Sequence, residues 1–524
     1  MARSREGGAE PGGGPLAIEL IGISKAFGPV EASRGIDIKV RRGTIHGIVG
    51  ENGAGKSTLM SILYGFYQAD AGEIRVGGAR AAIPDSQAAI RAGIGMVHQH
   101  FMLVEPFTVL ENVVLGAEDG ALLRPSLAKA RRALTRLATD HELQVDPDAV
   151  VGELSVGFQQ RVEILKALYR ECDILILDEP TGVLTPAEAD HLFRILTALR
   201  GEGKTIILIT HKLREIMAIT DAVSVMRRGE MVATMATAET SPAAIAEAMV
   251  GRRVLLTVEK GPARPGAVML AARSLGLVDE RGVERLREIS FELRAGEILG
   301  IAGVAGNGQS ELLDVLAGSM AASAGELRLR GAPLDVAAGG LVEARRAAGI
   351  AHVPEDRHRR GLVMPFAQWE NSCLGYHGEP RYAGPMATMN RAAVRDLARR
   401  GIEKFDIRPP SCDLPTANFS GGNQQKIVLA REIERDPDVL LVGQPTRGVD
   451  IGAIEFIHSQ IVALRDRGKA ILLVSVELDE IQALSDRILV MFDGRISGAR
   501  MAGDTDEREL GLLMAGIDPK DRAA

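Results

Sequence analysis

Short apolar runs and helix-like stretches follow one another along the chain. Residues 18–20 and 36–40 alternate apolar with polar side chains, as half-buried strands do. An apolar run at 45–49 follows, and after a glycine-rich segment the residues 59–64 are helix-like. This order of strands, glycine-rich loop and helix predicts an α/β fold in which a strand leads directly into a loop and a helix.

The glycine-rich segment has the spacing G-x-x-x-x-G-K-[ST], which is that of a phosphate-binding loop. Its glycines allow backbone N–H groups to turn toward phosphate oxygens, its lysine adds a positive charge, and its serine hydroxyl is a ligand suited to Mg²⁺. A purely structural turn would gain nothing from Lys-Ser-Thr at the entrance of a helix. The predicted nucleotide-binding residues are Gly50, Glu51, Asn52, Gly53, Ala54, Gly55, Lys56, Ser57 and Thr58.

Two acidic residues, Asp178 and Glu179, follow the strand-sized aliphatic run 174–177. A buried strand of this kind places its carboxyl end at the edge of a parallel sheet, where open α/β folds bind ligands. We expect Asp178 to be a magnesium ligand and Glu179 to polarise the attacking water. The aliphatic run 206–209 delivers His211 to the same edge, although a single histidine after a strand is more often structural.

Two further positions are candidates for the same site. Gln99 follows a predicted strand at 93–97, and its amide oxygen is suited to a metal ion or a water molecule. Phe27 lies upstream of the phosphate-binding loop, where a ring would stack on a purine base. A single phenylalanine is, by itself, more typical of a core than of a cofactor contact. The stretch 122–142 is helical in pattern and contains no chemical motif.

The whole pattern occurs twice. Residues 303–310 repeat the phosphate-binding loop at an offset of 253 residues, residues 419–426 repeat the stretch 154–161, and residues 439–445 repeat the acidic strand end. A repeat of this length indicates two copies of one α/β domain. Breakers such as Gly261, Pro262, Pro265 and Gly266 separate the copies. The expected organisation is a disordered tail at 1–15, a first domain at 16–250, a linker at 251–266 and a second domain at 267–515.

Composition narrows the possible classes of function. A length of 524 residues fits two domains, and a formal charge of −7 gives no electrostatic footprint for nucleic acid. No apolar run is long enough to span a bilayer, and residues 1–15 form neither a signal peptide nor an anchor. The three cysteines are too far apart for a metal knuckle or a redox pair, and we expect reduced thiols at Cys172, Cys373 and Cys412.

Taken in order, these motifs resemble the ATP-binding-cassette (ABC) family over almost the whole chain, from about residue 16 to the 510s. The resemblance implies tandem P-loop NTPase domains, each with a mainly parallel sheet, an antiparallel β subdomain and a helical subdomain. More narrowly, the chain looks like the fused double ATPase subunit of bacterial importers for simple sugars and nucleosides. The stretch 100–109 resembles the nucleoside branch, whereas 353–357 suits both branches.

In this family each ATP lies between the phosphate-binding loop of one cassette and the signature of the other. The resemblance therefore implies that Lys56, Ser57, Asp178 and the other motifs of the first half share a site with the signature of the second half. Every member of this first site is chemically competent. Its second-half residues are Ser420, Gly421, Gly422 and Asp450, and its metal ligands are Ser57, Gln99 and Asp178.

The second site implied by the resemblance has lost most of these groups. Gln309 replaces the lysine, and Gly443 and Gln444 replace the two acids. We therefore predict one hydrolytic site and one that binds nucleotide, if at all, without efficient turnover. The remaining replacements are Glu355 for Gln99, Val476 for His211, Asp279 near the position of Phe27, Thr185 for the crossing aspartate, and Val156 and Phe158 in the first-half signature.

The resemblance also implies the partners. These partners are transmembrane permease subunits, most simply two, and indirectly an extracytoplasmic solute-binding protein. Binding to such permease subunits would place the chain at the cytoplasmic face of the membrane. In the family the region after the glutamine contacts the permease, which here points to 100–108 and 359–369. The candidate side chains for an exposed docking surface there are Phe101, Met102, Phe107 and Trp369, and each of them fits a core position equally well.

The predicted function is thus an ATPase (ATP and Mg²⁺) that energises a nucleoside importer. The same role in an importer for a simple sugar such as ribose is the alternative. A soluble double-cassette ATPase acting on ribosomes or nucleic acid fits less well, because such proteins usually have two intact sites and a basic or helical linker. A structural partner without turnover is disfavoured by the completeness of the first site.

Overall fold

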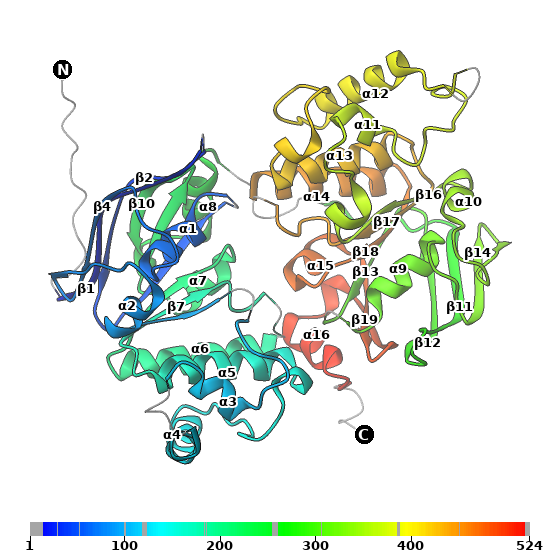
Figure 1. Cartoon of the computed structure of the whole chain (residues 1–524). Coiled ribbons are helices and arrows are strands. Elements are labelled where there is room, and N and C mark those ends of the chain that lie inside the picture. Colours follow the sequence, from blue (N-terminus) through cyan, green and yellow to red (C-terminus); the bar gives the residue numbers. More distant parts are fainter. Residues whose placement is uncertain are drawn as a thin grey trace, which may run out of the picture. The chain divides into compact units, whose positions relative to one another are not determined.

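The computed structural model describes residues 14–28, 30–51, 53–98, 101–117, 123–182, 184, 186–253, 260–304, 306–384, 388–449 and 451–518. The chain divides into two compact units, Met1–Val254 and Leu255–Ala524. Figure 1 shows the first unit in blue to green and the second in green to red. Each unit contains a six-stranded sheet, a four-stranded sheet and a set of helices.

The first unit is built around a six-stranded sheet of order β10-β9-β3-β8-β7-β6. Its strands are parallel except β10, which is antiparallel to β9. The strands that carry the sequence motifs, β3 and β7, are buried along their whole length, as expected for strands covered on both faces. The six strands are β3 (Ile45–Gly50), β6 (Ile94–Val97), β7 (Ile174–Asp178), β8 (Thr205–Ile209), β9 (Ala222–Arg227) and β10 (Glu230–Ala236).

The second sheet of this unit is antiparallel, with the order β2-β1-β4-β5. Helices α3, α4 and α5 pack on one another in a helical subdomain, and their apolar side chains share one core with side chains of β7 and β8. These strands are β1 (Leu16–Phe27), β2 (Val30–Arg41), β4 (Ala71–Val76) and β5 (Ala79–Arg80). The helices are α1 (Lys56–Leu63), α2 (Ser86–Arg91), α3 (Val109–Val114), α4 (Leu123–Asp140), α5 (Val156–Tyr169), α6 (Pro186–Gly201), α7 (Leu213–Ile219) and α8 (Pro242–Val250).

The second unit repeats this architecture. Its six-stranded sheet has the order β16-β17-β18-β13-β19-β20, and its antiparallel sheet has the order β12-β11-β14-β15. The strands are β11 (Val268–Val278), β12 (Glu284–Arg294), β13 (Glu297–Ala302), β14 (Ala324–Leu329), β15 (Ala332–Leu334), β16 (Ile350–Val353), β17 (Val439–Gly443), β18 (Ala470–Val474), β19 (Arg487–Phe492) and β20 (Arg495–Met501). The helices are α9 (Gln309–Ala317), α10 (Val342–Ala347), α11 (Gln368–Ser372), α12 (Arg391–Lys404), α13 (Gly421–Ile433), α14 (Ile451–Asp466), α15 (Leu478–Leu484) and α16 (Glu507–Met514).

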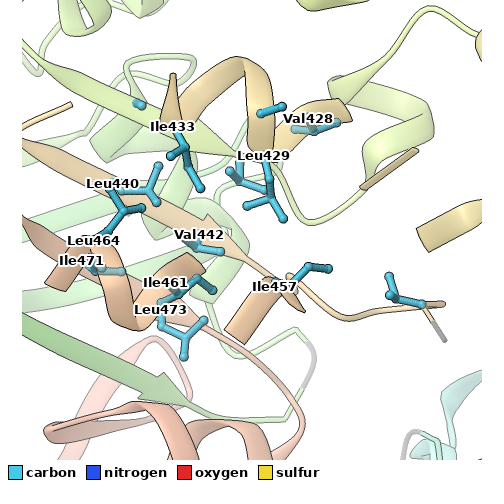
Figure 2. Close-up of a cluster of buried hydrophobic side chains, with 14 of the residues drawn as sticks. Val428, Leu429, Ile433, Leu440, Val442, Ile457, Ile461, Leu464, Ile471 and Leu473 are labelled. Carbon is cyan, nitrogen blue, oxygen red and sulfur yellow. The ribbon is translucent and has the colours of Figure 1, made fainter. Parts of the chain in front are cut away.

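A continuous aliphatic core fixes strand β17 against its flanking helices. In Figure 2 side chains from β17 and β18 converge with side chains from α13 and α14. Each fully buried aliphatic side chain contributes roughly 1.5–3 kcal/mol to the stability of such a core. The residues labelled in the figure are Val428, Leu429, Ile433, Leu440, Val442, Ile457, Ile461, Leu464, Ile471 and Leu473.

The predicted fold class is confirmed, with mainly parallel sheets, antiparallel subdomains and helical subdomains in both units. The run 174–177 and its repeat at 439–442 are buried strands. The three cysteines are free and buried, as expected for reduced thiols. The tail predicted at 1–15 lies almost entirely outside the described residues.

Candidate functional site

The first glycine-rich segment connects β3 to α1 in a conformation that requires its glycines. Gly53 and Gly55 have φ angles of 80° and 101°, in the region that L side chains rarely adopt. A Cβ atom built on Gly55 would lie 2.2 Å from the carbonyl oxygen of Ala32, and one on Gly50 would lie 2.3 Å from the carbonyl oxygen of Met226. The segment is therefore a tight cradle at the N-terminus of α1, a place where backbone N–H groups are available to bind an anion.

The side chain of Lys56 is buried beneath this loop. Its ammonium Nζ donates hydrogen bonds to the carbonyl oxygens of Gly50 (2.7 Å) and Glu51 (3.1 Å). Burial lowers the pKa of the ammonium, and the nearby carboxylates of Glu179 and Asp178 partly oppose that shift. A buried cation held by two loop carbonyl oxygens is well placed to exchange them for phosphate oxygens.

Asp178 ends strand β7 and accepts a hydrogen bond from the hydroxyl of Ser57. Burial raises the pKa of this carboxyl, the hydrogen bond from Ser57 opposes the shift, and the neighbouring Glu179 adds to it. The pair brings a hydroxyl and a carboxylate oxygen together at the loop, and oxygen ligands are those that Mg²⁺ prefers. The described residues contain no cluster of three or more His, Cys, Asp or Glu side chains suited to a metal ion.

Glu179 is held in a strained backbone conformation beside His211. Its φ angle is 47°, and its backbone N–H donates to the carbonyl oxygen of Ile209 at 2.8 Å. The Nδ1–H of His211 donates to Glu179 Oε1 at 2.9 Å. This hydrogen bond is the largest of the effects that lower the pKa of Glu179 below its ordinary value. The arrangement gives an ionised carboxylate, oriented by a histidine, next to a phosphate cradle.

Comparison of the sequence with known proteins identifies the family to which the chain belongs. The family model described as "ABC transporter" matches residues 33–182 and 286–447, one stretch in each unit. The chain belongs to the ABC transporter family. The resemblance drawn from the motif order is therefore confirmed, and the two units are ATP-binding cassettes.

Three relatives match the chain over nearly its full length. Guanosine import ATP-binding protein NupO of Bacillus subtilis is 46% identical, covering 96% of this chain and 98% of the relative. Nucleoside import ATP-binding protein NupA of Lactococcus lactis is 44% identical over 95% of this chain and 98% of its own length. Glucose import ATP-binding protein TsgD13 of Haloferax volcanii is 46% identical over 95% of this chain and 96% of its own length.

The second cassette keeps the shape of the loop but not its charges. Gly308 has a φ angle of 100°, matching Gly55. Gln309, at the position of Lys56, is buried and donates from its amide to the carbonyl oxygen of Val304 at 3.1 Å. Gln444, at the position of Glu179, has the same φ of 47°, and its Oε1 accepts a hydrogen bond from the backbone N–H of Val476 at 3.3 Å. The backbone conformation is thus the same in the two copies at these positions, while the side chains differ.

A carboxylate from another strand stands beside the second loop. Ser310, at the position of Ser57, donates its hydroxyl to Glu355, which follows β16. A Cβ atom on Gly443 would lie 2.5 Å from Glu355 Cγ, so the glycine at the position of Asp178 provides the space for Glu355. In the sequence alone Glu355 and Gly443 are two separate differences from the first cassette. The structure shows that they are spatially linked.

Phe27 is not a core residue. Its side chain is 43% exposed, and its ring lies 5.2 Å from that of Tyr67, edge to face. Tyr67 was not identified from the sequence, because it lies 40 residues from Phe27 and no spacing rule links the two. The exposed pair is accessible to a planar ligand.

The signature of the second cassette begins helix α13. Ser420 is its N-cap residue, and its Oγ accepts a hydrogen bond from the side-chain amide of Asn423 at 2.8 Å. A Cβ on Gly421 would lie 2.8 Å from the carbonyl oxygen of Gly448, so glycine is required there. In the first-cassette signature Phe158 is 40% exposed. Four predicted site or signature positions lie outside the described residues, namely Asn52, Gln99, Asp450 and Thr185, as does the side chain of Val156.

The prediction that Trp369 is an exposed docking residue is wrong. Trp369 is only 8% exposed and packs in the core of the second cassette, with the guanidinium of Arg395 5.3 Å from its ring. It lies in α11, the short helix after an exposed turn, and that turn presents Phe366 (42% exposed) instead. Met102 and Phe107 are exposed as predicted, and Phe101 is partly buried. Among the described residues no helix is long and apolar enough to cross a membrane.

Proposed function

We propose that the chain hydrolyses ATP at its first cassette and thereby energises the import of a nucleoside or a related small polar solute. The observation that carries this proposal is the set of groups around one loop: a buried lysine, a serine–aspartate pair, and an ionised glutamate oriented by a histidine. Their chemistry is that of binding a nucleotide phosphate and activating water.

The residues present fit a magnesium ion bound together with nucleotide. Ser57 and Asp178 would hold it, with Gln99 as a further candidate, and the ion would neutralise charge on the phosphate oxygens. Glu179 accepts the proton of the attacking water, and His211 keeps that carboxylate ionised and oriented. Lys56 offers its ammonium to the outer phosphates in place of its loop carbonyls. We propose that Ser420–Gly422, together with Asp450, also take part in hydrolysis at this loop, as the family resemblance implies.

The second cassette supports a regulatory rather than a hydrolytic role. It has no counterpart of the lysine, of either acid or of the histidine, although its loop keeps the same backbone shape. Nucleotide binding shifts a conformational equilibrium only if the nucleotide binds one conformation more tightly than the other. To move the ratio of the two conformations from 1:99 to 99:1, the affinities for them must differ by roughly 10⁴-fold. One hydrolytic loop is sufficient to reset such an equilibrium.

A nucleoside is favoured over a sugar because the stretch 100–109 resembles the nucleoside branch and because two of the three relatives carry nucleoside or guanosine import in their names. The glucose import relative, equal in identity to the guanosine one, supports the simple-sugar alternative, ribose included. A soluble ATPase acting on ribosomes or nucleic acid is disfavoured, since all three relatives are import proteins matched over their full length. The proposal places the chain on the cytoplasmic face of the membrane, bound to permease subunits and indirectly served by a solute-binding protein.

The test is uptake of radiolabelled guanosine and, separately, ribose in cells that carry either the native chain or the Glu179→Gln variant as their only copy. Loss of guanosine uptake alone in the variant would support the nucleoside proposal. Loss of ribose uptake alone would keep the mechanism and assign the chain to a sugar importer. Unchanged uptake of both would refute both assignments.

A further inference from the structure

The segment that follows β16 in the second cassette is longer than the segment that follows β6 in the first. The strand register fixes one end of this comparison, because β6 pairs with β7 as β16 pairs with β17. The other end is fixed by Asn112 and Asn371, whose side-chain oxygens accept from the backbone N–H of Val104 and of Val363. Seven positions separate the end of β6 from Val104, whereas ten separate the end of β16 from Val363. The second cassette therefore has three additional residues at this place.

The longer segment contains a single π-helical turn, Arg357–Gly361. The carboxylate of Asp356 caps the turn by accepting from the backbone N–H of His358 at 2.9 Å. Two side-chain hydrogen bonds then attach the turn to helix α13. His358 donates from Nε2 to Gln424 Oε1 at 2.7 Å, and Arg431 Nη1 donates to the carbonyl oxygen of the last residue of the turn at 2.8 Å. The turn is thus fixed along the helix that begins with the signature.

Arg357, the first residue of the turn, lies against the start of that signature. Its Nη1 donates to the carbonyl oxygen of Arg447 at 2.7 Å, and its Nη2 donates to that of Gly448 at 3.5 Å. A Cβ atom built on Gly421 would lie 2.8 Å from Nη2 of Arg357 and 2.8 Å from the carbonyl oxygen of Gly448. The planar guanidinium group therefore joins residues 447–448 to the first turn of α13, and the glycine leaves the space for it.

This placement of Arg357 takes its guanidinium group partly out of water. Its Nε is buried and, among the described residues, has no hydrogen-bond partner. Burial lowers the pKa of the group, and the carboxylate of Asp356 opposes that shift. A cation that gives up part of its hydration depends on the carbonyl oxygens that it reaches. Arg359, in the same turn, has an exposed side chain and offers a matched comparison.

The two parts of the chain that Arg357 joins are those that the proposed function assigns to hydrolysis. Ser420–Gly422 form the signature, and Asp450 follows Gly448 by two residues in the sequence. The rate of a reaction depends on how closely such groups are held, since a misplacement of about 1 Å can cost roughly 10²-fold. An arginine that fixes the signature against residues 447–448 is therefore in a position to affect the rate without contacting the nucleotide.

We propose that Arg357 is a positioning residue for ATP hydrolysis, because it holds Ser420–Gly422 against residues 447–448 in one fixed arrangement. His358 supports it by anchoring the turn to α13. The effect on hydrolysis rests on the proposed function, whereas the contacts of Arg357 lie entirely within the second cassette. The cassette that lacks the catalytic groups thus contributes to catalysis through a segment that is longer than its counterpart in the first cassette.

Hydrogen exchange on the full chain tests the positioning without any use of activity. In Arg357→Ala, the amides of 420–424 and 446–449 should exchange several-fold faster than in the native chain, while those of α5 in the first cassette stay unchanged. Arg359→Ala, the matched control, should exchange like the native chain. Arg357→Lys keeps the cation but not the planar fork, so it should show a smaller increase, and it serves if the alanine variant does not fold. Native exchange rates in the Arg357 variants, or an equal increase in Arg359→Ala, would overturn the proposal.

Steady-state phosphate release from the purified chain tests the effect on hydrolysis. Arg357→Ala should lower kcat by about tenfold, because the signature is less closely held. Its affinity for a fluorescent nucleotide should stay near the native value, since the loop around Lys56 is unchanged. Arg359→Ala should keep the native kcat. A kcat for Arg357→Ala within about twofold of the native value would refute the positioning role.

A double variant separates positioning from a general loss of stability. Gly421→Ala places a methyl group between Arg357 and residues 447–448, so it should also lower kcat. If Arg357 acts through this contact, the two substitutions together should cost less than the product of their separate effects. Effects that multiply in full would refute the proposal. A native chain that does not hydrolyse ATP would instead refute the proposed function, and the exchange rates would still decide whether Arg357 holds the signature.

Discussion

The Nδ1 atom of His211 lies 2.9 Å from Oε1 of Glu179, at the end of two neighbouring parallel strands. In the second cassette the same two backbone positions carry Val476 and Gln444, and there a backbone N–H bonds a side-chain amide oxygen instead. The two cassettes therefore have the same backbone geometry at these positions, but only the first carries a carboxylate that can accept a proton. This difference allows each catalytic prediction to be paired with a control in the same molecule.

The Glu179→Gln variant should lose ATP hydrolysis while it still binds nucleotide. A positioned general base typically raises the rate of a reaction by 10²–10⁴-fold, so we expect the turnover of the purified chain to fall by about that factor. Binding should persist because the loop glycines and Lys56 are unchanged. The measurement is phosphate release alongside fluorescent nucleotide binding. Gln444→Ala is the matched control and should hydrolyse ATP at the native rate; a loss in the control equal to that in Glu179→Gln would contradict the assignment.

The His211→Ala variant should shift the pH dependence of hydrolysis. The hydrogen bond from His211 is the largest effect lowering the pKa of Glu179, so its removal raises that pKa toward the ordinary value. Glu179 accepts a proton only when ionised, and the acid limb of the rate profile should therefore move to higher pH. The profile of turnover against pH for native and variant proteins tests this. An acid limb that stays in place, or moves to lower pH, would count against the role of His211.

Ser420→Arg should reduce hydrolysis although Ser420 belongs to the second cassette. The family resemblance assigns Ser420–Gly422 to the competent site, and an arginine at the start of α13 replaces a small N-cap residue with a bulky cation. Ser155→Arg, the same change at the start of α5, is the control and should leave turnover near the native rate because the resemblance assigns that signature to the degenerate loop. Steady-state phosphate release separates the two. A greater loss from Ser155→Arg would reverse the assignment.

Sequence reasoning located the site where chemistry depends on local spacing. The loop 50–58, the acids at the end of β7 and the histidine after β8 are each indicated by a few neighbouring residues, and parallel strands bring them to one edge. It could not find the contact of Phe27 with Tyr67 or that of Glu355 with Gly443, because both join residues far apart in the sequence. The sequence also could not predict which of these apolar side chains are buried. Trp369, a candidate docking residue in the sequence, is a core residue in the structure.

Trp369→Ala should therefore act on stability. A large aromatic side chain removed from a packed core costs about 3–5 kcal/mol, and Trp369 lies in the core between α11 and α12 of the second cassette. Phe366, three residues before it, is 42% exposed, so Phe366→Ala should change the free energy of unfolding by less than about 0.5 kcal/mol. Urea unfolding of both variants, followed by circular dichroism, tests the difference. If instead Trp369→Ala unfolded like the native chain, the tryptophan would be a surface residue, and the docking role first expected for it would have to be reconsidered.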